Sequence, residues 1–170
     1  LIYRKTLSLL GSISAMNNLI VRSLTDTDTP ALSALLTEDS DYSQYFVPFA
    51  NPSPDFFATL FASVEQDCYW GIFVNKALAG FCMLRGFDAG YQRPSFGVYI
   101  SKVYQGCGLA TLALRWCLSY CRVNQIDAVM LKVHPDNKVA RHIYEANGFV
   151  SLETDERTGH LMMEKRWDAS

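Results

Sequence analysis

The stretch from Val98 to Thr111 reads VYISKVYQGCGLAT and joins an apolar, strand-like segment to the start of a helical pattern. Two glycines, Gly106 and Gly108, separate the two parts. Glycine adopts backbone conformations that other residues avoid, so the chain can turn tightly here. The N–H groups of a first helical turn have no partners within the helix and can face a bound anion. The stretch therefore predicts a strand, an anion-binding turn and a helix; a glycine-containing helix start without a ligand is the alternative.

Residues 107–122 carry an amphipathic pattern typical of a helix that packs on a sheet. Ala128 to Val133 is a short, largely apolar run of the kind found inside a sheet, and His134-Pro135-Asp136-Asn137 ends it. A second helix is expected from about Lys138 to Asn147. The apolar positions of the first helix are Leu109, Leu112, Ala113, Trp116, Cys117, Tyr120 and Cys121.

Asn137 and Tyr144 lie seven positions apart, at the start and near the end of the second helix. Seven steps of about 100° return to nearly the same side of a helix, so the two residues share one stripe about 10 Å long. That spacing suits a long, thin ligand. Each residue also has a purely structural interpretation: Asn137 as an N-cap, Tyr144 as a core aromatic residue, and Gly148 as an ordinary C-cap.

Taken together, these residues resemble the GNAT superfamily of acyl-CoA-dependent N-acetyltransferases. Gln105-x-x-Gly108-x-Ala110 is similar to the family's pyrophosphate motif, and Asn137-x-x-Ala140-x-x-x-Tyr144-x-x-x-Gly148-Phe149 is similar to its catalytic helix. The resemblance is specific from about Tyr69 to Phe149 and looser outside. It implies an α+β fold in a single domain, with a mixed sheet of about six to seven strands, a splayed central strand and about four flanking helices.

The resemblance also implies a site for acetyl-CoA. Main-chain N–H groups of the turn would hold the pyrophosphate, Val98 and Ile100 would pair with the pantetheine arm, and Asn137 would position that arm. Tyr144 is the implied catalytic residue and would protonate the departing thiolate. A free thiol titrates near about 8.5 and a phenol near about 10, so full proton transfer runs uphill by roughly 2 kcal/mol, and a hydrogen bond to the developing charge is the alternative. The implied cofactor-binding residues are Val98, Ile100, Gln105, Gly106, Cys107, Gly108, Leu109, Ala110, Thr111 and Asn137, and no metal is implied.

The general base is not evident from the sequence. An alkyl ammonium titrates near about 10.4, so it must lose a proton before its nitrogen attacks a thioester. Many relatives place Glu or Asp on the strand that here reads PSFGVYI from Pro94 to Ile100, and this strand has no carboxylate. Candidates by charge alone are Asp88, Glu38, Asp39 and Asp41, each of which also suits a solvated loop.

Two segments, 38–54 and 86–94, are expected to form the acceptor pocket, as in similar enzymes. The alternative for 38–54 is a hydrophobic lid that packs on the sheet. We expect a primary amine as acceptor, in the first place a small molecule. A sugar amine, an antibiotic, a polyamine, an amino acid and a protein N-terminus stay open. The residues that suggest the pocket in 38–54 are Glu38, Asp39, Asp41, Tyr42, Tyr45, Phe46 and Phe49.

Composition fits one compact domain, with 170 residues, 49% of them hydrophobic and 19% charged. The net charge of −2 and the lack of a Lys/Arg stripe argue against a nucleic-acid partner. The five cysteines show no Cys-x-x-Cys spacing, which favours reduced thiols in a cytoplasmic protein over disulfides or a zinc site. No run of about 18 apolar residues occurs, so we expect no membrane span. The oligomeric state stays open.

Residues 1–15 are expected to be a vector-derived or upstream extension, because Met16 suits a start and the first strand follows it closely. Their short apolar centre matches a signal peptide poorly. The N-acetyltransferase-like domain then covers residues 16–170. Its expected strands are 19–24, 69–74, 77–85, 94–101, 127–134, 149–153 and 160–166, and its expected helices are 28–37, 54–66, 107–122 and 138–147.

The sequence thus predicts an N-acetyltransferase in which an amine attacks acetyl-CoA directly within a ternary complex. Two alternatives stay open. A non-catalytic acyl-CoA-binding or protein-interaction domain of the same fold is favoured mildly by the missing strand carboxylate. A dinucleotide-binding oxidoreductase is weaker, because its fingerprint wants Gly or Ala where Thr111 stands and an acid where His134 stands.

Overall fold

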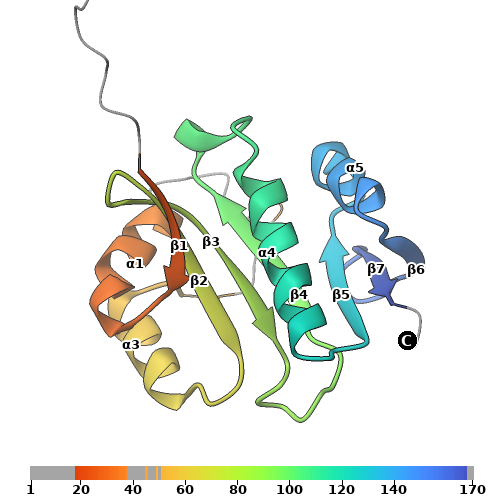
Figure 1. Ribbon diagram of the computed structural model, residues 1–170, viewed down its shortest axis with the longest axis horizontal. Coiled ribbons are helices and arrows are strands. Elements are labelled where there is room, and N and C mark those ends of the chain that lie inside the picture. The colour runs from red at the N-terminus through yellow and green to blue at the C-terminus, as the bar shows by residue number, and fades with distance from the viewer. Residues whose placement is uncertain (1–17, 38–44, 46–48, 50, 168–170) are drawn as a thin grey trace, which may run out of the picture.

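A computed structural model of the chain describes residues 18–37, 45, 49 and 51–167. Seven strands form one sheet in the order β1-β2-β3-β4-β5-β7-β6 (Figure 1). Neighbouring strands are antiparallel except β4 and β5, which run parallel. This arrangement differs from the mostly parallel sheet of dinucleotide-binding folds and argues against that alternative. The strands are β1 (Leu19–Ser23), β2 (Cys68–Val74), β3 (Ala77–Arg85), β4 (Ser95–Ile100), β5 (Ala128–Val133), β6 (Val150–Thr154) and β7 (Leu161–Arg166).

The helices begin and end where local residues dictate. The Ser53 hydroxyl accepts a hydrogen bond from the Phe56 N–H at 3.1 Å and starts α3, which ends before the expected residue 66 because Val64 is extended. Gly108 has a φ of 81° and precedes the first residue of α4, so this helix begins two residues after the expected 107. The helices are α1 (Thr29–Thr37), α3 (Pro54–Ser63), α4 (Leu109–Val123) and α5 (Lys138–Ala146), with short 3-10 segments η1 (Asp26–Asp28) and η2 (Lys102–Tyr104).

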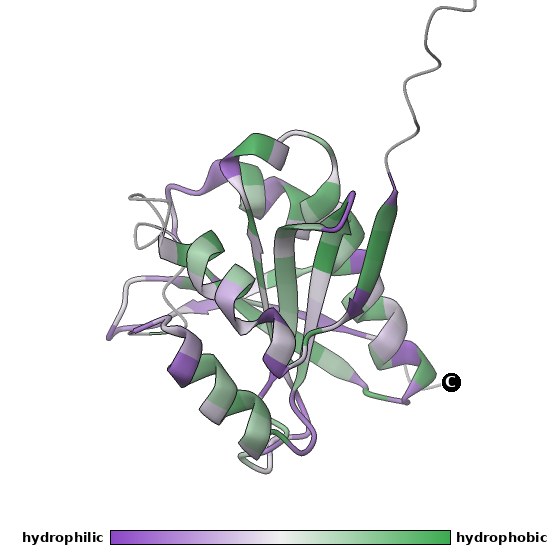
Figure 2. Ribbon diagram, turned by 90° about the vertical axis from the view of Figure 1, so that its left-hand side faces the viewer, coloured by the Kyte–Doolittle hydropathy of each residue, from purple (hydrophilic) through white to green (hydrophobic). Residues whose placement is uncertain are grey.

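Helices cover both faces of the sheet, and side chains alternate between the faces along each strand. On β3, Cys82 and Leu84 belong to the hydrophobic core under α4 and α5, whereas Phe81 and Met83 belong to the core under α1 and α3. We call these two sides the α4/α5 face and the α1/α3 face. Figure 2 shows hydrophobic residues along the strands that lie between the two helical layers.

β4 and β5 diverge along their length. Among the strand residues that the structure describes, they pair only where Ser95 lies beside Met130, and the Met130 N–H donates to the Pro94 carbonyl at 3.0 Å. β4 stays paired with β3 up to Ile100, and β5 stays paired with β7 up to Val133. The two strands therefore open a wedge toward their carboxyl ends. The expected splayed central strand is confirmed.

The predicted α+β fold, with a mixed sheet and helices on both sides, is also confirmed. None of the helices in the described part of the chain combines the length and the apolar character that a bilayer-spanning segment needs. Residues 1–15, for which the sequence suggested an upstream or vector-derived origin, lie outside the described residues.

Candidate active site

A cavity of about 1670 Å³ follows the wedge between β4 and β5. It brings together nearly all of the residues that the sequence predicted for the site. Cys107 is the exception, because its exposed side chain is not part of the lining. The predicted residues that line the cavity are Val98, Ile100, Gln105, Gly106, Gly108, Leu109, Ala110, Thr111, Asn137 and Tyr144.

The cavity reaches both faces of the sheet. Val98 and Ile100 pack against the core of the α4/α5 face, and Tyr144 belongs to that core. Tyr99, which also lines the cavity, belongs to the core of the α1/α3 face. Met83, on the same face, lines it as well. A ligand in the wedge would therefore have access from two opposite sides of the sheet.

The main chain of β4 offers hydrogen-bonding groups toward the open side of the wedge. The Ser101 N–H donates to the Ala79 carbonyl of β3 at 2.9 Å. Because main-chain groups alternate in direction along a strand, those of Val98 and Ile100 point away from β3 and toward β5. The Gln105 side-chain amide donates to the Ile100 carbonyl at 3.2 Å, so Gln105 ties the turn to the end of this strand.

The turn before α4 has the geometry that its glycines suggested. Gly106 and Gly108 have φ values of 77° and 81°, in the left-handed region that favours glycine. The next main-chain N–H groups belong to the first turn of α4 and lie in the cavity wall. α4 carries no acidic residue in its first turn, so nothing there offsets the positive end of the helix dipole.

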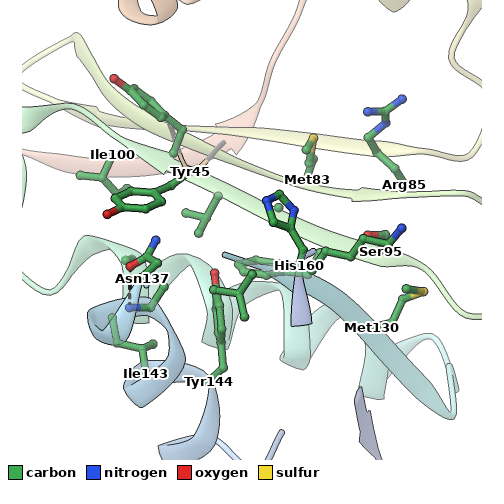
Figure 3. A pocket seen from close by; sticks show the side chains of 18 of the residues that line it. Tyr45, Met83, Arg85, Ser95, Ile100, Met130, Asn137, Ile143, Tyr144 and His160 are labelled. Atoms are coloured by element: carbon green, nitrogen blue, oxygen red, sulfur yellow. Dashed lines mark hydrogen bonds between the residues drawn. The ribbon is translucent and has the colours of Figure 1, made fainter. Parts of the chain in front are cut away.

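Asn137 and Tyr144 both reach the cavity from α5 (Figure 3). The Asn137 side-chain oxygen accepts a hydrogen bond from the Ala140 N–H at 3.1 Å, so Asn137 is a helix cap as well as a lining residue. Its NH₂ group is the part that can donate to a ligand. The structural interpretation of Asn137 and its predicted position at the cavity are therefore compatible.

Tyr144 is 8% exposed, and its hydroxyl points into the cavity (Figure 3). Its ring meets the Phe96 ring edge-on, with ring centres 6.2 Å apart. The centre of the Phe149 ring lies 5.9 Å from that of Tyr144. Burial raises the pKa of Tyr144 above its ordinary value. The phenol therefore stays protonated, and it can donate a hydrogen bond to negative charge in the cavity.

Two histidines near the cavity had no role in the sequence analysis. The His160 ring lies 5.5 Å from the His134 ring, and the His134 ring lies 5.3 Å from that of Tyr45. His160 and Tyr45 line the cavity. The pairing of β7 with β5 brings the two histidines together, because Leu161 pairs with Val133. Sequence patterns could not predict that register, although His134 at the end of a predicted strand was a partial signal.

Asp88, one of the four carboxylates proposed as bases, does not line the cavity. Both oxygens of Asp88 are used outside it, accepting hydrogen bonds from the Glu65 and Gln66 N–H groups at 3.3 and 2.7 Å. The other three candidates, Glu38, Asp39 and Asp41, lie outside the described residues.

Asp67 is the only carboxylate among the described residues that line the cavity. One of its oxygens accepts hydrogen bonds from the N–H groups of Gly86, Phe87 and Asp88 at 2.7, 2.8 and 3.3 Å. Asp67 thus holds the loop between β3 and β4. The sequence gives no local signal for this role, because the partners of Asp67 follow it by about twenty positions.

Both segments that were expected to form the acceptor pocket contribute described residues to the cavity lining. In 86–94, Tyr91 and Arg93 line the cavity, and Arg93 forms an ion pair with the buried Glu164 of β7. In 38–54, Tyr45 lines the cavity, whereas Phe49 packs against Phe57 and Phe81 in the core, as the alternative interpretation predicted. Tyr42 and Phe46 lie outside the described residues.

Comparison with protein families identifies the class of protein. The profile of the acetyltransferase (GNAT) domain matches residues 18–150. The chain therefore belongs to the GNAT acetyltransferase family. Comparison with curated protein sequences gave no significant match.

Solved acetyltransferase structures share the fold. The ribosomal-protein-S5-alanine acetyltransferase from Vibrio fischeri matches with a TM-score of 0.77 at 14% identity, over 88% of this chain and 93% of that one. An N-acetyltransferase from Thermoplasma acidophilum in complex with coenzyme A matches with a TM-score of 0.73 at 19% identity, over 88% of this chain and 99% of that one. A putative acetyltransferase from Salmonella typhimurium with its cofactor acetyl-CoA matches with a TM-score of 0.74 at 15% identity, over 90% of this chain and 96% of that one.

Proposed function

We propose that this chain is an N-acetyltransferase that transfers the acetyl group of acetyl-CoA to a primary amine. The observation that carries the proposal is a single cavity that joins a glycine turn, the open edge of a splayed strand and a buried tyrosine. Family membership supports the proposal. So do the Thermoplasma and Salmonella structures, which contain coenzyme A and acetyl-CoA.

The turn before α4 suits the pyrophosphate of the donor. A side chain at Gly106 or Gly108 would meet no described atom within 4 Å of its Cβ, so there is room for phosphate oxygens beside the main-chain N–H groups. The positive end of the α4 dipole favours an anion at the same place. The proposed contacts are the main-chain groups of Gln105, Gly106, Cys107, Gly108, Leu109, Ala110 and Thr111.

The pantetheine arm would follow β4 into the wedge. Val98 and Ile100 would hydrogen-bond it with their main chain, as an added strand would. To receive the arm, the Ile100 carbonyl would give up the hydrogen bond that it now accepts from the Gln105 side chain and accept one from the arm instead. The NH₂ group of Asn137 would position the arm near the thioester, which would then lie close to Tyr144.

Tyr144 would stabilise the departing sulfur mainly as a hydrogen-bond donor. Full proton transfer from a phenol to a thiolate is already uphill by roughly 2 kcal/mol at ordinary pKa values. Burial raises the pKa of Tyr144 and makes the complete transfer less favourable still. A donor fixed in a dry site lowers the energy of the developing negative charge without giving up its proton.

The reaction would proceed by direct attack within a ternary complex. The amine nitrogen attacks the acetyl carbon, the C–N bond forms, and the C–S bond breaks as coenzyme A leaves. The two-faced cavity supports this order, because donor and acceptor can enter from opposite sides of the sheet. No covalent intermediate on the protein is needed.

The acceptor is proposed to be a small-molecule amine. A protein N-terminus is the competing choice, since the Vibrio relative is named for the alanine of a ribosomal protein. A cytoplasmic location is proposed from the cysteines, because all five are free. Three of them, Cys82, Cys117 and Cys121, are buried.

The test combines donor binding with product detection. Calorimetry with acetyl-CoA, and with NADH as control, should show binding of acetyl-CoA alone. Wild-type protein and acetyl-CoA are then incubated with polyamines, amino sugars, amino acids and peptides with free N-termini, and products are detected by mass spectrometry. A thiol-reactive dye is unsuitable, because Cys107 is exposed. Binding without any acetylated amine would favour the non-catalytic domain, and absence of binding would reject the proposal.

A further inference from the structure

Asp67 is the only carboxylate among the described residues that line the cavity. Its Oδ1 accepts hydrogen bonds from three main-chain N–H groups of the β3–β4 loop, which fixes the carboxylate to that loop, and β4 carries no acid. An alkyl ammonium needs a proton acceptor, because it titrates near about 10.4 and its nitrogen cannot attack while protonated. The described lining residues also offer a basic group of another kind, the imidazole of His160.

His160 stands on the side of the sheet opposite Tyr144. On β7, Met163 packs in the core of the α4/α5 face, so residues an odd number of positions away point to the α1/α3 face. The Asp155 N–H donates to the His160 carbonyl at 2.8 Å, which extends the β6–β7 ladder to His160. His160 therefore reaches the cavity from the α1/α3 face, whereas Tyr144 reaches it from the α4/α5 face (Figure 3).

A well-bonded turn fixes the position of His160. One oxygen of Asp155 accepts hydrogen bonds from the Arg157 and Thr158 N–H groups at 2.9 and 3.2 Å. Its other oxygen forms an ion pair with Lys132 of β5. The turn that carries His160 is thus attached to the strand that borders the wedge. This attachment holds the imidazole at the mouth of the cavity.

The groups around His160 favour its neutral form. Burial, the nearby His134 and Lys132 lower the pKa of His160, and Asp155 opposes them. Asp155 is already paired with Lys132, which weakens that opposition. The remaining polar or charged neighbours are Tyr45 beside His134, Asp136 with an oxygen 3.9 Å from His134 Nδ1, and Arg157 in the cavity wall. At neutral pH the imidazole therefore has a free lone pair.

We propose that His160 is the general base of the reaction and that it deprotonates the acceptor amine on the α1/α3 face. The inference rests on the proposed function. His160 takes one proton from the ammonium nitrogen and releases it to solvent. The neutral amine then attacks the acetyl carbon and forms the C–N bond. The second proton leaves the same nitrogen and accompanies the sulfur when the C–S bond breaks, so coenzyme A leaves as the thiol.

The experiment compares His160→Gln with wild type on two nucleophiles. The first is the panel amine with the highest wild-type rate, and the second is methoxyamine, which is unprotonated at neutral pH and needs no base before attack. With the alkyl amine at pH 7, kcat/KM should fall by about 10²-fold. With methoxyamine, kcat/KM of His160→Gln should fall by less than about threefold relative to wild type. His142→Gln is the matched control, because His142 is exposed on α5 and does not line the cavity.

The pH profile gives a second readout that a structural role would not produce. The wild-type kcat/KM should fall as the pH is lowered, because His160 becomes protonated. The midpoint of that fall should lie under about pH 6.5. His160→Gln should lack that step and should recover as pH approaches the pKa of the amine. Binding of acetyl-CoA should be unchanged.

An equal loss with both nucleophiles, or an unchanged wild-type pH profile in His160→Gln, would overturn the inference. A carboxylate from 38–44 would then be the next candidate base. If wild type acetylates no nucleophile at all, the proposed function fails instead, so the two failures are distinguishable.

Discussion

The two faces of the wedge are built in different ways. On the α4/α5 face, the proposed donor site comes from one continuous segment, Val98 to Thr111, and one short helix, α5. On the α1/α3 face, the proposed acceptor site joins Tyr45, Arg93 and His160, which lie far apart in the sequence. The first face relies on main-chain groups and local turn chemistry, and the second relies on side chains that long-range packing brings together. A local motif can therefore define the donor site, whereas the acceptor site depends on the register of the whole sheet.

The largest effect should come from blocking the main-chain turn. Gly108→Glu should weaken acetyl-CoA binding by about 10³-fold, because it places bulk and negative charge where the phosphates would lie. Calorimetry measures the change. The control is Gly90→Glu, since Gly90 has a similar φ of 84° and equally open surroundings but lies outside the cavity lining. Equal weakening by both variants would mean that backbone strain, and not loss of the site, is responsible.

Tyr144→Phe removes the donor on the α4/α5 face and should lower kcat by about 10²-fold, the usual effect of losing one hydrogen bond to developing charge. The dissociation constant of acetyl-CoA should stay within about twofold, because Phe fills the same space between Phe96 and Phe149. Steady-state kinetics separates the two quantities. An undiminished kcat would remove Tyr144 from the mechanism.

Asp155→Asn tests the α1/α3 face alone. Loss of the ion pair with Lys132 should loosen the His160 turn and lower kcat/KM for the amine by about three- to tenfold, with acetyl-CoA binding unchanged. Lys132 and the main-chain donors lower the pKa of Asp155 to about 2. Because this pKa is depressed, the stabilising contribution of the pair is present above about pH 4 and is lost as pH falls through about 2. The pair therefore stays intact across the range in which His160 titrates.

The steady-state kinetics of Asp155→Asn should be measured from pH 5 to pH 8, with the amine and acetyl-CoA varied in turn. Lys132→Met is the matched partner variant, because it breaks the same ion pair from β5. At pH 8, where His160 is neutral in both proteins, the two variants should give similar losses. A fall in acetyl-CoA affinity in either variant would contradict the independence of the two faces.

The smallest effect should come from Cys107→Ser. Cys107 lies in the glycine turn before α4, but its exposed side chain is not part of the cavity lining. If the donor contacts are main-chain groups, the dissociation constant of acetyl-CoA should change by less than about twofold. A tenfold change in calorimetry would show that the thiol itself takes part in binding.

Sequence reasoning predicted the features that depend on local chemistry. Gly106 and Gly108 signalled left-handed conformations, Asn137 signalled a helix start, and the splayed β4 followed from the family resemblance. It missed His160, because only the pairing of Leu161 with Val133 brings the β6–β7 turn to the end of β5. It also overextended α3, because the chain leaves the helix at Val64, whose backbone is extended.

Charge alone is a weak guide to which acid reaches the cavity, as Asp88 and Asp67 show. Charge alone suggested Asp88, yet its oxygens hold the main chain at Glu65 and Gln66. Asp67, which reaches the cavity, holds the β3–β4 loop. Carboxylates in loops often satisfy main-chain N–H groups, and only the three-dimensional path of the chain shows which ones do so.

An NMR titration of the ¹⁵N-labelled protein with acetyl-CoA would show directly which face of the sheet holds the donor. We expect the amide signals of Val98, Ile100 and 105–111 to shift strongly, and those of β6 and of the turn before His160 to change little. Loss of these shifts in Gly108→Glu would locate the donor on the α4/α5 face. Shifts confined to the α1/α3 face, or no shifts at all, would contradict the division of the cavity into a donor side and an acceptor side.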